Sequence, residues 1–88
     1  MCRSIRPLNN FAPPATAEEI HAAALQYVRK VSGATHPSQA NADAFAIAVA
    51  AVEEATASLL GTLVTAAPPK DREVEAAKAR ARAAARYA

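Results

Sequence analysis

Residues 16–33 read TAEEIHAAALQYVRKVSG, and this stretch decides the fold because it contains every signal needed for one helix. Thr16 and Glu19 have the spacing of a capping box, in which each side chain bonds to the other residue's backbone amide. Gly33 suits the left-handed conformation that ends many helices. The stretch predicts a helix over residues 17–32. Its apolar face consists of Ile20, Ala23, Ala24, Tyr27, Val28 and Val31.

A second apolar stripe follows the loop sequence GATHPSQAN. It predicts a helix over residues 39–64, for which Ser38 or Asn41 is the expected N-terminal cap. A loop of modest length joins the two helices, which should form an antiparallel hairpin. The stripe consists of Phe45, Ala48, Val49, Val52, Ala55, Thr56, Leu59, Leu60 and Leu63.

Prolines separate this hairpin from the segments on either side. The first 15 residues contain three of them, and proline disfavours helix both at its own position and at the one before. We therefore expect an extended arm whose apolar residues Ile5, Leu8 and Phe11 lie along a groove on the hairpin. A second proline pair precedes Asp71, which is the expected cap of a third, basic helix over residues 72–87.

The predicted fold is all-α and forms one small domain. It comprises an arm (1–15), a helical hairpin (16–64), a proline-rich linker (65–71) and a C-terminal helix (72–88). Alanine supplies much of the apolar content, so a chain of 88 residues has few large core side chains, and self-association is one way to add buried surface. The core candidates are Ile5, Leu8, Phe11, Ile20, Leu25, Tyr27, Val28, Val31, Phe45, Ile47, Val49, Val52, Leu59, Leu60, Leu63, Val64 and Val74.

Several function classes are disfavoured by composition. A single cysteine excludes an intramolecular disulfide, and the N-terminus has no apolar segment typical of a signal peptide. Glu53 and Glu54 interrupt the most apolar window, which argues against a membrane span. The expectation is a soluble cytoplasmic protein. The net charge of +2 is too small to indicate nucleic acid, although the chain from Arg72 onward has five basic and two acidic residues.

The chain resembles one family along nearly its whole length. The stretches MCRSIRPLNNFAPPAT, AAALQYVRKVSG, PSQANADAF and APPKDREVEAAKARARAAARYA carry the resemblance, to domain-of-unknown-function family 2277. The resemblance implies a bacterial source and an MCR start as a family feature, and it implies no catalytic residues. The chain differs from the family pattern at His21, Ala34 and His36, where arginine, phenylalanine and lysine are expected.

Cys2 is the first candidate site, because removal of Met1 would leave a free amine beside its thiol. That amine, together with Arg3 and Arg6, would lower the pKa of the thiol and make it a nucleophile or a redox group. Amine and thiolate together would also suit a soft metal. The alternative, which we favour, is that Cys2 is a buried, inert side chain that fixes the arm.

Other catalytic constellations are weaker. Cys2, His21, His36 and Asp43 are ligand types that suit zinc, but their spacing matches no common site and both histidines depart from the family pattern. We therefore predict no metal and no cofactor. The sequence has no nucleophile paired with a base and no glycine-rich phosphate loop, so an enzyme is not favoured.

Lys78, Arg82 and Arg86 lie four residues apart and share one face of the third helix. Phosphate binding by this face would depend on salt. A solvated helix surface and a partner-helix interface are the alternatives. The leading prediction is a non-enzymatic binding or interaction module, with a protein partner or a second copy. A thiol-dependent activity at Cys2 and weak nucleic-acid binding through the third helix are the alternatives.

Overall fold

The first helix begins and ends where the sequence predicts. In the computed structural model, which describes residues 5–87, α1 spans Ala17–Ser32. The Thr16 hydroxyl accepts a hydrogen bond from the Glu19 amide at 3.1 Å, and the Glu19 carboxylate accepts one from the Thr16 amide at 2.9 Å. Gly33 ends the helix with a φ of 73°. The predicted capping box and left-handed cap are both confirmed.

The second helix is shorter than predicted. A short 3-10 turn, η1, occupies Gln39–Asn41, and α2 spans Ala42–Thr62. Neither expected cap uses its side chain on the helix, because the Asn41 amide donates to the Ser38 hydroxyl at 3.0 Å instead. At the other end Leu63 is already extended. The nearby Gly61 and Thr62 are weak helix formers, which is consistent with this earlier end.

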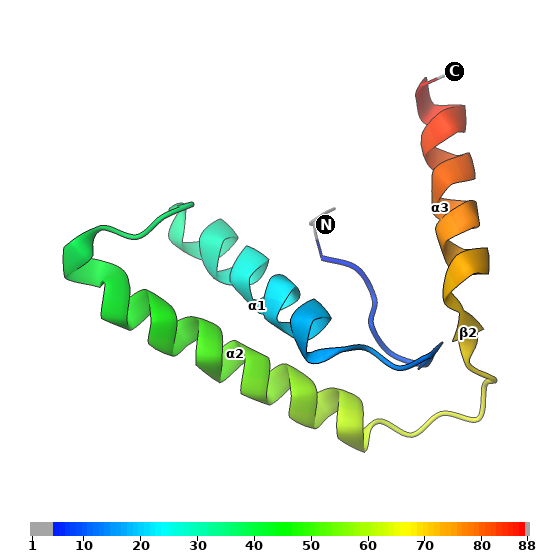
Figure 1. Cartoon of the computed structure of the whole chain (residues 1–88), viewed down its shortest axis with the longest axis horizontal. Helices are drawn as coiled ribbons and strands as arrows, with labels where there is room; N and C mark the ends of the chain where they lie inside the picture. Colours follow the sequence, from blue (N-terminus) through cyan, green and yellow to red (C-terminus); the bar gives the residue numbers. More distant parts are fainter. Residues whose placement is uncertain (1–4, 88) are drawn as a thin grey trace.

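The helices α1 and α2 lie side by side and are joined at one end by residues 33–41, as Figure 1 shows. Ala24, Val28 and Val49 form the core between them, and Ala24 is 1% exposed. Four partly buried apolar side chains surround this core: Leu25, Phe45, Ala48 and Val52.

The arm also forms a strand that the all-α prediction missed. β1 (Phe11–Ala12) pairs in parallel with β2 (Lys70–Asp71), so that Phe11 lies opposite Lys70. The protein is therefore mostly helical, with three α-helices and a very small parallel sheet among the described residues. Strands of two residues leave no alternating pattern in a sequence, and these two come from distant segments of the chain.

The third helix, α3, spans Arg72–Tyr87 and stands away from the other two helices in Figure 1. Asp71 caps it as predicted, because its carboxylate accepts from the amides of Glu73 and Val74 at 2.8 and 3.0 Å. The chain measures 43 × 38 × 18 Å, and its radius of gyration is 15.5 Å. A compact chain of this length would have a radius of about 12 Å.

This open arrangement corrects the list of core candidates. One shared face between two helices covers few side chains, and α3 does not cover their outer faces. Seven candidates are therefore exposed: Tyr27, Val31, Ile47, Leu59, Leu63, Val64 and Val74. The helical segment Gln39–Thr62 is also long and apolar enough, by length and composition, to cross a membrane, although Glu53 and Glu54 lie within it.

The two glycines should respond in opposite ways to alanine. Gly33→Ala should destabilise the fold by about 1–2 kcal/mol, because a Cβ strains the left-handed conformation. Gly61→Ala should stabilise it by about 0.5 kcal/mol, because this glycine is helical and its new Cβ would meet no neighbour within 4 Å. Denaturation followed by circular dichroism measures both changes, and equal effects at the two positions would contradict the assigned conformations.

Candidate functional site

One arginine joins three segments of the chain. The Arg72 guanidinium donates to both Glu19 carboxylate oxygens, at 2.7 and 2.9 Å. It also donates to the carbonyl of Pro13 at 2.7 Å and to the carbonyl of Pro14 at 3.0 Å. We call these four groups the Arg72 clamp. The clamp ties the start of α3 to the arm and to the first turn of α1.

The position of Arg72 indicates that this arginine serves a tertiary contact. It is the first residue of α3, where the positive end of the helix dipole disfavours a cation. The planar guanidinium matches a carboxylate with two parallel hydrogen bonds, and both of its bonds to Glu19 are charge-assisted. These contacts offset the unfavourable position.

Glu19 has two roles at once. It completes the capping box of α1 and accepts from Arg72. The hydrogen bond from Arg72, followed by that from the Thr16 backbone, lowers the pKa of Glu19 from 4.5 to about 2. The same contact raises the pKa of Arg72. The side chains of Glu19 and Arg72 are 34% and 32% exposed, so water and salt reach this pair.

A turn at Asn10 aligns the arm with the linker before α3. Asn10 has a φ of 63°, a left-handed conformation that asparagine tolerates better than most residues. Its side-chain amide donates to the carbonyls of Ala67 and Pro68 at 3.3 and 3.1 Å. The Lys70 amide donates to the Asn10 carbonyl at 2.8 Å. This turn therefore positions β1 against β2.

The Phe11 ring lies beside the two cations that follow the linker. The Lys70 ammonium is 5.4 Å from the ring centroid, and the guanidinium carbon of Arg72 is 5.7 Å from it. Both distances are within the range of cation–π attraction. Phe11 therefore supports the clamp from the arm side.

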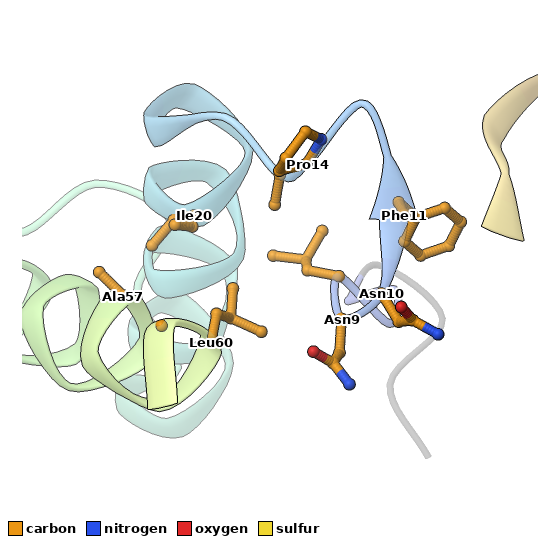
Figure 2. A pocket seen from close by; sticks show the side chains of 10 residues that line it. Asn9, Asn10, Phe11, Pro14, Ile20, Ala57 and Leu60 are labelled. Atoms are coloured by element: carbon orange, nitrogen blue, oxygen red, sulfur yellow. The ribbon is translucent and has the colours of Figure 1, made fainter. Parts of the chain in front are cut away.

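The arm and the ends of α1 and α2 enclose an open pocket of about 350 Å³. In Figure 2, Ile20, Ala57 and Leu60 come from the helices, and the arm residues lie across from them. All its lining residues are uncharged, so the pocket suits an apolar group rather than acid–base chemistry. It is lined by Leu8, Asn9, Asn10, Phe11, Pro14, Ala15, Ile20, Ala57, Leu60 and Gly61.

The residues considered for thiol and metal chemistry do not assemble into a site in the described part of the chain. Cys2 and Arg3 lie outside the described residues, and Arg6 is exposed. His21 contacts Glu53 across the two helices, whereas His36 lies beyond the other end of α1, roughly 16 Å of helix away. Within residues 5–87, no three His, Cys, Asp or Glu side chains gather as metal ligands would.

The basic residues of α3 are separate from the clamp and the pocket. Lys78, Arg82 and Arg86 are exposed. The Lys78 ammonium lies 3.1 Å from the Glu75 carboxylate, one turn away, so part of this charge is balanced within the helix.

Sequence reasoning missed the clamp, although two signals of it were present. A cation at the first position of α3 opposes the dipole, and Asn10 precedes an aromatic residue and two prolines. Neither signal identifies Glu19 as the partner of Arg72, because the capping box already accounts for a glutamate at position 19. The clamp depends on pairing between segments more than 50 residues apart.

Comparison with known proteins gives one match. Residues 1–78 match the family described as Uncharacterized conserved protein (DUF2277). No curated protein and no solved structure matches the chain.

Replacing Arg72 should return Glu19 to an ordinary acid. The lowered pKa means that the ionised carboxylate stabilises the fold above about pH 4.5, and this contribution is lost as the pH falls towards 2. In Arg72→Gln, the pKa of Glu19 measured by NMR titration should rise from about 2 towards 4.5. Arg82→Gln is the control, because that arginine is exposed on the same helix and should leave the titration unchanged. A Glu19 titration that is identical in native protein and Arg72→Gln would rule out the clamp.

Proposed function

The chain belongs to this family of uncharacterised conserved proteins. We propose that it is a non-enzymatic interaction module that binds another protein chain through α2 and α3. The family match confirms the resemblance carried by the MCR and AAALQYVRK stretches. The observation that carries the proposal is the amount of surface that the chain leaves open to solvent.

The accessible surface is 6834 Å², whereas a folded monomer of 9.1 kDa exposes about 4,900 Å². The excess exceeds the roughly 800 Å² per partner that a standard protein interface covers. A chain that buries so little of its own surface is stabilised when a partner binds and buries more of it.

The exposed apolar residues indicate where the partner binds. Ile47 is 69% exposed and Leu59 is 54% exposed, and both lie on α2. Leu63 and Val64 follow Leu59 past the end of the helix, with Val64 at 95% exposure. An exposed apolar patch of this kind, at the end of α2, is typical of an interaction site.

We propose that α1 and α2 form an antiparallel hairpin that presents this surface. His21, near the start of α1, contacts Glu53 in the second half of α2. Val28, near the end of α1, belongs to the same core as Val49, which comes earlier in α2. Residues later in α1 therefore lie against residues earlier in α2, and this order supports an antiparallel arrangement.

The proposal places the protein in the bacterial cytoplasm. Two adjacent glutamates near the middle of α2 make insertion of this helix into a bilayer costly. Glu53 also contacts His21 of α1, a contact that insertion of α2 alone would break. The open apolar face of α2 is therefore assigned to a protein partner.

Two other functions rank below this one. Phosphate binding by Lys78, Arg82 and Arg86 would use an exposed face, but Lys78 is already paired with Glu75. A thiol activity at Cys2 has no support from the described residues. The pocket between the arm and the helices is lined by uncharged residues, which favours binding over catalysis.

Removing the apolar contacts on α2 should release the partner. The tagged chain, purified from cells that make it naturally, should give a native mass above the 9.1 kDa of one chain. Ile47→Gln combined with Leu59→Gln should reduce the particle to that single-chain mass with helicity retained. Val31→Gln is the matched control, since Val31 is also 69% exposed but lies on α1. A native chain that always has the mass of one molecule would contradict the proposal.

A further inference from the structure

One face of α3 is apolar and is bordered by basic residues. At helical spacing, Val74, Ala77, Ala81 and Ala84 align along this face. Lys78 and Arg82 border it on one side, where Lys78 is paired with Glu75, and Glu73 and Arg80 border it on the other. From Lys78 onward, every charged residue of the helix is basic. Val74 is 51% exposed, and α3 stands apart from the α1–α2 pair in Figure 1.

The helix α2 has the opposite charge. Its charged residues are Asp43, Glu53 and Glu54, and it contains no lysine or arginine. Glu53 points to α1, where it contacts His21, whereas Asp43 and Glu54 are exposed. By helical spacing, Asp43 and Glu54 lie on the same outward face of α2 as Ile47.

The two charges are kept apart within one chain. Residues 5–71 contain four basic and six acidic residues, a net charge of −2, and residues 72–87 contain five basic and two acidic residues, a net charge of +3. The Arg72 clamp fixes the start of α3 on the arm, and from there the helix points away from α2. The complementary faces can therefore meet only between two molecules.

We propose that the partner is a second copy of this chain, in a two-fold dimer in which α3 of each copy lies on the outer face of α2 of the other. This inference rests on the proposed function and specifies its partner. A reciprocal contact of this kind closes on itself and uses each surface once. The lengths fit, because α3 extends for about 24 Å and α2 for about 31 Å.

The area also fits a dimer. The chain exposes 6834 Å² against the roughly 4,900 Å² of a folded monomer, so the excess is about 1,900 Å² per chain. Two contacts of standard size, each covering about 800 Å² of a chain, would together cover an area of this order.

A second copy fits these faces better than a lipid surface. Helices that lie in a membrane interface use large side chains such as leucine, phenylalanine and tryptophan on their apolar face. The apolar face of α3 offers one valine and a series of alanines, which bury little area in lipid. Small side chains do allow two helices to approach closely, and the bordering charges of α3 are opposite to those of α2.

The test exchanges charges between the two faces. Glu54→Lys and Arg82→Glu should each weaken dimerisation of the full chain by about tenfold, because every dimer then contains two like-charge contacts. An equal mixture of the two variants should restore the dimer as a heterodimer, since both contacts then join opposite charges. Sedimentation of the separate and mixed variants measures this, and circular dichroism verifies that each is folded.

Two exposed residues outside the proposed interface supply matched controls. Glu18→Lys and Arg6→Glu make the same changes in net charge on α1 and on the arm, and they should leave the dimer unchanged. Native dimers should also weaken as salt rises, because the bordering charges lie at the surface.

The remaining outcomes each overturn the inference. Dimers that neither charge variant weakens, or a mixture that stays monomeric, would exclude α2–α3 pairing. A native particle containing a different protein, with the purified chain monomeric, would leave the interaction module standing but contradict self-association. A strict monomer with no partner would contradict both. Flotation with anionic phospholipid vesicles, without dimerisation, would assign the faces to a membrane.

Discussion

The bidentate contact between the Arg72 guanidinium and the Glu19 carboxylate fixes where α3 begins, and the shape of the molecule follows from this. Glu19 is itself held by the first turn of α1 through the capping box. The clamp therefore transmits the orientation of α1 to the start of α3, while the Asn10 turn holds the linker beside the arm. Without these contacts, α3 would be attached through a flexible linker.

Most local signals predict the fold correctly, although neither Ser38 nor Asn41 caps α2 with its side chain as expected. The cap at Thr16, the glycine end at Gly33 and the Asp71 cap all act within four residues, and each was read correctly from the sequence. The strand pair and the clamp were not predictable, because they join the arm to a segment more than 50 residues away. Burial was overestimated for the same reason: an amphipathic pattern shows that a face is apolar, but not that the chain covers it.

The candidate site was anticipated only in outline. The sequence predicts that Ile5, Leu8 and Phe11 lie along a groove on the helices. Leu8 and Phe11 do line the pocket between the arm and α1 and α2, whereas Ile5 is not among its lining residues. The sequence could not show that Phe11 also lies beside Lys70 and Arg72, because cation–π contacts have no sequence pattern. The exposed faces of α2 and α3 follow from the clamp, since it directs α3 away from its own chain.

In the proposed dimer, α3 is stable because it packs on another copy. A single helix of 16 residues is marginal in water, so slow exchange of its amides requires packing. Hydrogen exchange of the α3 amides, measured over a range of protein concentrations, tests whether α3 depends on a second copy. The α3 amides should become protected as the protein concentration rises, while those at the α1–α2 core should stay protected throughout. Protection of α3 that does not change with concentration would contradict the proposed dimer.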